Sequence, residues 1–234
     1  MNLKRTFVYS AVCIIAFSLI ITATYNFSVI TSGRVNNEKD NTVVVLDAGH
    51  GGEDGGAVSV SGVVESELNL KFTKKLKSIL NINGFQTVMT REDEGDLADK
   101  SLPTISERKK SDMYKRLDIY NSDIHNVAIS IHQNIYPAVS CTGSQVFYST
   151  KVPTAQTLAQ NITSSIVGSV QKDNIREPKP TGGSIFLLDN ATVPAVIVEC
   201  GFLSNEDEVK VLCDVEYQKK ISYCIFCGFM NTEF

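Results

Sequence analysis

Two histidines and one glutamate in this chain stand at the ends of short, largely apolar runs. The runs are residues 43–46, 127–131 and 193–198. His50 lies four residues after the first run, and His132 and Glu199 directly follow the second and the third. Such runs predict buried strands, and the carboxyl ends of strands in an α/β sheet collect ligands. Because imidazole and carboxylate groups bind metals and transfer protons, the three side chains predict a metal or catalytic site.

The loop of residues 49–56 surrounds His50 with glycine. A lone histidine is more often a hydrogen-bonded structural residue than a ligand, but a second strand-end histidine, His132, favours a site. The loop lacks the Gly-Lys-Ser/Thr sequence of a phosphate cradle and carries Glu53 and Asp54, whose charges repel phosphate. Nucleotide binding is therefore disfavoured.

Five motifs in this chain follow one another in the order typical of one enzyme family. They are Asp47-Ala48-Gly49-His50-Gly51-Gly52, Glu65-x-x-x-Asn69-Leu70, Thr90-Arg91, Ser130-Ile131-His132-x-Asn134 and Val198-Glu199-x-Gly201-Phe202-Leu203-Ser204-Asn205. Over residues 43–228 the chain resembles the zinc-dependent N-acetylmuramoyl-L-alanine amidases of the Amidase_3 family, which hydrolyse peptidoglycan. Within that family it is most similar to the short sporulation and germination amidases. Each motif alone is weak, whereas five in order are specific.

The resemblance implies one Zn²⁺ per chain. Its ligands would be His50, Glu65 and His132, which leave a fourth position for water. Glu65 stands at the metal-ligand position of the family's Glu-x-x-x-Asn pattern, although Ser66 replaces the lysine usual there. From the residues alone, Glu65 and Glu67 are also explained as carboxylates that stabilise the first turn of a helix.

The resemblance assigns proton transfer to Glu199, which would take a proton from water and return it to the leaving amine. A carboxylate at a strand end, beside the apolar Val198, is partly desolvated, and desolvation raises its pKa into a useful range. A structural ion pair is the alternative for Glu199. Cys200, one residue further on, should point to the opposite face of the strand and has no catalytic role.

Three further residues are expected near the site. Arg91 and Asn134 would bind substrate, and for Arg91 a surface pair with Asp93 is an equal alternative. Asp47 would hold the second ring nitrogen of His50, a task that a backbone carbonyl could also perform.

The resemblance implies hydrolysis of the amide between N-acetylmuramic acid and the first L-alanine of the stem peptide, in the maturation of the spore cortex. A zinc peptidase that cuts within the stem, and a peptidoglycan-binding domain without catalysis, are the alternatives. Residues 133–142 are too few to hold the inhibitory helix that some division-associated amidases carry there. We therefore expect control by timing of expression, by a membrane tether, or by a protein partner that raises activity or zinc affinity.

The spacing of apolar residues predicts a single α/β domain over residues 42–234. Leu68, Phe72 and Leu76 share one face of an amphipathic helix that ends at Gly84 and joins two strands by a right-handed crossover. We expect a mixed, mostly parallel sheet with helices on both faces. Further strands are expected at 85–90 and 143–148, a short strand or turn at 185–188, and helices at 105–121, 154–170, 207–212 and 216–229.

The amino-terminal residues differ in composition from the rest. Lys4 and Arg5 precede residues 7–30, which carry no charge and are numerous enough to span a bilayer as a helix. We expect residues 1–31 to be a signal anchor or a cleaved signal peptide, and residues 32–41 to be a linker. The domain would then be exported and either membrane-anchored or secreted. The resemblance to sporulation amidases points to the space between the forespore and mother-cell membranes.

The net charge of the chain is −4, without a basic block. This charge argues against a nucleic-acid partner and against tight electrostatic binding to anionic wall polymers, so peptidoglycan must be bound at a specific site. The six cysteines form no compact disulfide framework. Cys224 and Cys227 lie in an apolar helical stretch, and we expect them to pack in the core as small apolar residues.

Overall fold

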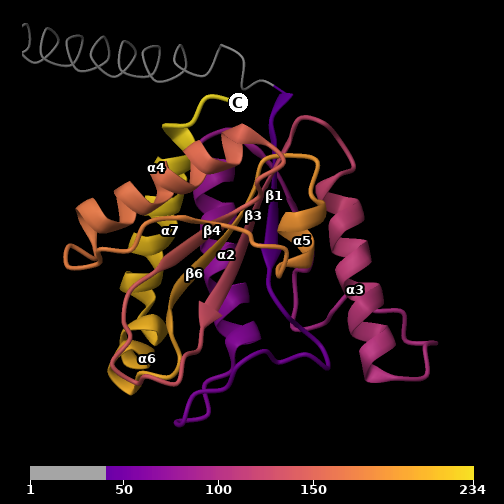
Figure 1. The fold of residues 1–234 in the computed structure, drawn as a ribbon, viewed down its shortest axis with the longest axis horizontal. Helices are drawn as coiled ribbons and strands as arrows, with labels where there is room; N and C mark the ends of the chain where they lie inside the picture. Colours follow the sequence, from indigo (N-terminus) through magenta and orange to yellow (C-terminus); the bar gives the residue numbers. More distant parts are fainter. Residues whose placement is uncertain (1–40) are drawn as a thin grey trace, which may run out of the picture. The chain divides into compact units, whose positions relative to one another are not determined.

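One six-stranded sheet organises the computed structural model, which describes residues 41–234 (Figure 1). The strands are β1 (Val43–Ala48), β2 (Gln86–Met89), β3 (Asn126–Asn134), β4 (Gln145–Tyr148), β5 (Lys179–Pro180) and β6 (Ala195–Phe202). Their order across the sheet is β2-β1-β3-β6-β4-β5. Neighbours among β1, β2, β3 and β6 pair in parallel, and β4 pairs antiparallel with β6. The mixed, mostly parallel sheet expected from the sequence is confirmed.

The register of the central strands aligns their carboxyl ends. Leu46 of β1 lies opposite Ile129 of β3, and His132 of β3 lies opposite Glu199 of β6. Because these strands run parallel, the loop after β1 and the ends of β3 and β6 lie at the same edge of the sheet. That edge carries His50, His132 and Glu199, as the sequence predicted.

Helices cover both faces of the sheet, as expected. They are α2 (Glu65–Ile82), α3 (Ile105–Tyr120), α4 (Pro153–Ser169), α5 (Phe186–Asn190), α6 (Glu206–Cys213) and α7 (Val215–Met230). Helices α2, α4 and α7 pack against one face, and α3 and α5 pack against the other (Figure 1). The sheet is therefore the middle of three layers.

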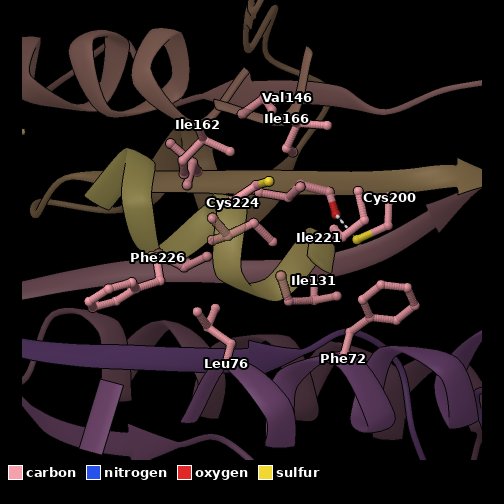
Figure 2. Packing of buried hydrophobic residues seen from close by; sticks show 14 of the residues in the cluster. Phe72, Leu76, Ile131, Val146, Ile162, Ile166, Cys200, Ile221, Cys224 and Phe226 are labelled. Atoms are coloured by element: carbon pink, nitrogen blue, oxygen red, sulfur yellow. Dashed lines mark hydrogen bonds between the residues drawn. The ribbon is translucent and has the colours of Figure 1, made fainter. Parts of the chain in front are cut away.

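The larger hydrophobic core lies between the sheet and helices α2, α4 and α7. Phe72 and Leu76 of α2 are buried with Ile131 of β3, Ile162 of α4 and Cys224 of α7 (Figure 2). The apolar stripe of α2 is thus buried on the sheet as its spacing predicted. The cysteines among residues 41–234 are free, and Cys224 behaves as a small apolar core residue.

Helix α5 differs from the sequence prediction of a short strand or turn at residues 185–188. Its first turn is stabilised because Asp189 accepts hydrogen bonds from the backbone of Ile185 (3.0 Å) and from the hydroxyl of Thr181 (2.7 Å). Leu187 and Leu188 are buried in the second core, on the α3 side of the sheet. These side-chain contacts, which local apolar spacing does not reveal, favour the helix.

The expected leader, residues 1–31, lies outside the described residues, as does the expected linker 32–41 except for Asn41. Within residues 41–234, no helix is both long and apolar enough to cross a membrane. The elements above all belong to one compact unit, Thr42–Phe234.

Candidate metal centre

Three residues from distant parts of the chain meet at the carboxyl edge of the sheet. One nitrogen or oxygen atom from each of His50, Glu65 and His132 lies within 4.8 Å of the other two. Nε2 of His50 is 3.3 Å from Oε2 of Glu65, and Nδ1 of His132 is 3.0 Å from Oε1 of Glu65. A single carboxylate therefore lies between two imidazoles.

The loop after β1 brings the His50 ring to this point through an unusual backbone conformation. His50 has a φ of 61°, and it is the one non-glycine residue of the described chain with a positive φ. A Cβ added to Gly56 would lie 2.5 Å from Oε2 of Glu65 and 2.8 Å from the His50 ring. The glycines of the loop are thus needed for close approach as well as for backbone freedom.

Glu65 is the first residue of α2, yet its carboxylate does not cap that helix. The preceding residue, Val64, also provides no side-chain cap. Instead, the carboxylate of Glu65 accepts hydrogen bonds from the backbone of Ala57 (2.8 Å) and Gln133 (3.1 Å) and from the amide of Asn69 (3.3 Å). Helix capping therefore does not explain this residue.

The electrostatics of the cluster favour a cation. Burial would raise the pKa of Glu65, but hydrogen bonds and charge from His132 and His50 hold that pKa well below its usual range. Burial would lower the pKa of His50, but Asp54 and Glu65 raise it to about 9. Two imidazoles and one buried carboxylate are a nitrogen and oxygen donor set typical of Zn²⁺, so these residues fit that metal.

Asp54, rather than Asp47, contacts the His50 ring. Oδ2 of Asp54 lies 2.9 Å from Nδ1 of His50. A carboxylate at this nitrogen fixes the ring orientation and leaves Nε2 to face Glu65. The expected contact between Asp47 and His50 is wrong.

Asp47 lies instead in a buried polar network on the α3 side of β1. Its carboxylate accepts hydrogen bonds from the hydroxyls of Thr90 (2.6 Å), Tyr120 (2.9 Å) and Ser130 (2.6 Å). It also forms an ion pair with the guanidinium of Arg116. Burial would raise the pKa of Asp47, but Arg116 and the hydroxyls outweigh it and hold the pKa well below its usual range.

Arg91 is buried, and most of its guanidinium N–H groups bind the protein backbone. Its guanidinium donates hydrogen bonds to the backbone carbonyls of Ala48 (2.8 Å), Gly49 (3.1 Å), Ser66 (2.8 Å) and Asp93 (2.7 Å). Arg91 therefore joins the loop after β1 to the start of α2. The alternative of a surface pair with the Asp93 carboxylate is wrong, because Arg91 is buried and contacts the Asp93 backbone carbonyl. The expected substrate contact stays a prediction.

Glu199 lies on β6 directly opposite His132 of β3. Its Oε2 atom is buried and has no hydrogen-bond partner among residues 41–234. Burial raises the pKa of Glu199 to about 7. His132 acts to lower this pKa, and the negative charge of Glu65 acts to raise it. Cys200 packs in the core on the other face of β6, as strand alternation predicted.

Asn134 and the third histidine, His125, lie in different settings. Asn134 ends β3, is partly exposed, and lies opposite Phe202. His125 lies in an exposed turn, where its ring is 2.8 Å from the carboxylate of Asp123, and it is outside the ligand cluster.

Sequence reasoning did not identify Arg116 as part of the site. Its guanidinium donates to the backbone carbonyls of Ala48 (2.9 Å) and His50 (2.7 Å) and pairs with Asp112 (2.7 Å). A signal was present, because Asp112, Arg116 and Tyr120 are four residues apart and share one face of α3. Polar residues on the buried face of a helix indicate a buried partner of opposite charge.

Several known proteins are similar to this chain in sequence and in fold. The family model described as N-acetylmuramoyl-L-alanine amidase, Amidase_3, matches residues 44–231. The germination-specific N-acetylmuramoyl-L-alanine amidase of Bacillus subtilis (strain 168) is 33% identical over 189 residues, which cover 81% of this chain and 78% of that protein. The CwlD amidase from Clostridioides difficile, solved in complex with the GerS lipoprotein, matches with a TM-score of 0.78 and 35% identity over 81% of this chain and 97% of that one. An N-acetylmuramoyl-L-alanine amidase from Clostridium difficile 630 matches with a TM-score of 0.68 and 27% identity over 81% and 95% of the two chains.

Proposed function

The chain belongs to the N-acetylmuramoyl-L-alanine amidase family Amidase_3, and we propose that it hydrolyses its peptidoglycan substrate with one Zn²⁺ held by His50, Glu65 and His132. The bond broken is the amide between N-acetylmuramic acid and the L-alanine of the stem peptide. One observation carries the metal proposal: three donor atoms converge within 4.8 Å. Glu199, across the strand pair from His132, supports a catalytic use of that metal.

Held by His50, Glu65 and His132, Zn²⁺ would polarise the scissile carbonyl and would lower the pKa of a water molecule toward about 7. Glu199 takes the proton of the attacking water as the oxygen adds to the carbonyl carbon. It then gives that proton to the alanine nitrogen as the carbon–nitrogen bond breaks and the amine leaves. Burial raises the pKa of Glu199, which favours both transfers near neutral pH, and its Oε2 has no hydrogen-bond partner among residues 41–234.

The residues around Glu65 keep the ligands in place during these steps. Asn69 donates to the carbonyl of Gly49 (3.1 Å) as well as to Glu65, so it joins α2 to the loop that carries His50. Asn134, partly exposed at the end of β3, is proposed to bind the stem peptide. Arg91 remains a second candidate for that contact, although four of its five N–H groups bind backbone carbonyls.

Mass analysis of digested muropeptides tests which bond is cut. The purified protein with zinc should release intact stem peptides that begin with L-alanine, and should leave glycan strands without peptide. Shortened stems that remain attached to the glycan would instead identify a zinc peptidase. An absence of any product would support a binding domain without catalysis.

Metal analysis tests the ligand set. His50→Ala, Glu65→Ala and His132→Ala should each bind zinc more weakly than the wild type, which should hold one ion per chain. His125→Ala is the matched control, because His125 lies outside the cluster, and it should bind zinc normally. Unchanged zinc affinity in Glu65→Ala would contradict the proposed ligand set.

We propose that the enzyme is exported and acts on the spore cortex. The similarity to the germination-specific amidase of Bacillus subtilis supports this role. In the producing bacterium, replacement of Glu199 by glutamine should leave spore formation intact and block germination. Normal germination of such spores would refute the cortex role and would leave the proposed amidase reaction unaffected.

We also propose a protein partner that raises activity or zinc affinity. The CwlD amidase that matches this chain was solved in complex with the GerS lipoprotein, which supports a partner of that kind. The purified chain alone should then bind zinc weakly and digest glycan strands slowly. Tight zinc binding and rapid digestion by the isolated chain would leave expression timing and a tether as the means of control.

A further inference from the structure

Helix α3 contacts the loop of residues 48–54 through Lys109. This lysine pairs with Asp54, the carboxylate that contacts the His50 ring. Nζ of Lys109 lies 2.8 Å from Oδ1 of Asp54, and the other oxygen of the same carboxylate lies 2.9 Å from Nδ1 of His50. Lys109, Asp54 and His50 thus form a continuous chain from the helix to the imidazole. The lysine is 55 residues away from Asp54 in the sequence.

Two arginines of α3 hold the same loop at other points. Nε of Arg108 lies 2.8 Å from Oε2 of Glu53, and Nη2 of Arg116 donates to the carbonyl of His50 at 2.7 Å. Helix α3 therefore contacts the loop both at His50 and at Glu53. Among the other helices of residues 41–234, α2 alone forms an ion pair with this loop, through Glu65 and the His50 ring.

The loop needs such support because its backbone is strained. His50 has a φ of 61°, Gly51 a φ of 131° and Gly52 a φ of 55°. Within the loop, Gly51 and Asp54 exchange two backbone hydrogen bonds, at 2.8 and 2.9 Å, which close the turn but do not fix its position. A non-glycine residue at positive φ persists only where its surroundings hold it there.

We propose that Lys109 is a positioning residue for the metal site. It holds the Asp54 carboxylate against Nδ1 of His50, so that Nε2 of His50 faces Glu65 in the orientation that binds metal. Helix α3 thereby influences the zinc affinity of the site, although none of the proposed ligands belongs to this helix. The inference rests on the zinc site proposed above.

A role in folding does not account for the Lys109 contact. The side chains of Lys109 and Asp54 are 49% and 32% exposed, and ion pairs at such positions contribute little to stability. Residues that orient a metal ligand have a different effect, because their loss lowers metal affinity by about 10- to 100-fold. Substitution of Lys109 should consequently change metal binding far more than folding.

Zinc affinity of the full chain, measured by competition with a chelator, tests the proposal. Lys109→Met should bind zinc about tenfold more weakly than the wild type, at the lower end of the range for residues that orient ligands. Lys109→Arg, which keeps a cation within reach of Asp54, should recover most of the loss. Lys115→Met removes the same charge from an exposed position of the same helix and should bind zinc like the wild type.

The absorption spectrum of the Co²⁺-substituted protein supplies a second readout, because it reports the geometry of the ligands. We expect it to change in Lys109→Met and to return in Lys109→Arg, while the unfolding midpoint of the metal-free protein stays close to that of the wild type.

Wild-type zinc affinity in Lys109→Met would overturn the proposal, and so would an equal loss in Lys115→Met. A loss of affinity matched by an equal loss of metal-free stability would also overturn it, since the role would then be structural. If the wild type binds no zinc, the proposed function itself fails, which is a distinct result.

Discussion

The His132 imidazole approaches the backbone at Gly49 so closely that only hydrogen fits between them. A Cβ at position 49 would lie 2.1 Å from Nε2 of His132 and 2.2 Å from its Cε1. This backbone is part of the loop that also carries His50, and Gly49 O accepts from Asn69 of α2. The glycine therefore determines how near the two imidazoles can come, with ring centroids 4.9 Å apart.

Gly49→Ala should weaken zinc binding by about tenfold or more, because the added methyl group displaces the His132 ring. Chelator competition measures the change. Gly182→Ala is the matched control, since a Cβ at Gly182 meets no atom within 4 Å, and it should bind zinc normally. Equal zinc affinity in the two variants would contradict the close-approach argument.

At the scale of elements, α3 is joined to β1 by a buried ion pair. The Arg116 and Asp47 side chains are 2% and 1% exposed. Removal of one partner leaves a buried charge without compensation, which costs far more than the pair itself contributes. The same helix carries the cations that hold the metal loop, so its position matters to both stability and the site.

Arg116→Met should lower the free energy of unfolding by about 3–5 kcal/mol, because Asp47 would keep its charge without a cation. Urea denaturation of the metal-free protein measures this loss. Arg108→Met removes a cation of the same helix whose partner, Glu53, is 44% exposed, and it should cost about 1 kcal/mol or less. Similar losses in the two variants would contradict the argument that breaking the buried pair costs more free energy of unfolding than breaking an exposed one.

Helices α4 and α7 pack closely at a second glycine. A Cβ at Gly228 of α7 would lie 2.5 Å from backbone atoms of Ile162 in α4, which cannot move aside as a side chain can. Gly228→Ala should therefore destabilise the protein by about 1–3 kcal/mol. Gly168→Ala, in α4 with open space around it, should instead stabilise by about 0.5–1 kcal/mol. Thermal unfolding of both variants distinguishes opposite signs, and two changes of the same sign would contradict the packing argument.

At the scale of the whole molecule, stability should fall in acid. The folded-state pKa of Asp47 lies below its unfolded value of about 3.9, so its contribution is full above that value and is lost as the pH falls through and below it. Urea denaturation of wild type and Asp47→Asn should therefore give a stability difference that is large near neutral pH and shrinks below about pH 4. A difference that does not vary with pH would contradict the shifted pKa.

Most of the fold could be predicted from the sequence, because the burial of apolar residues determines which faces of the helices and strands pack together. The apolar stripe of α2 and the apolar runs of β1, β3 and β6 specify which faces are covered, and strand ends then bring His50, His132 and Glu199 to one edge. The helix α5 was missed because its first turn depends on contacts made by the Asp189 side chain rather than on periodicity.

The roles of buried polar residues were harder to predict, because they depend on which element covers a face. Strand alternation puts Asp47 on the same side of β1 as Val45, and Val45 packs in the core on the α3 side. Proximity to His50 in sequence is therefore misleading for Asp47. Arg91 is similar, since the carbonyls that it binds come together only after the loop and α2 have folded.

The pairing of metal content with turnover in Glu199→Gln tests the central claim most directly. The substitution removes the proton-transfer group and leaves His50, Glu65 and His132 unchanged. The variant should hold one zinc per chain with wild-type affinity and digest stem-bearing glycan strands about 100- to 10,000-fold more slowly. Turnover near the wild-type rate in a zinc-loaded Glu199→Gln would contradict the assignment of proton transfer to Glu199.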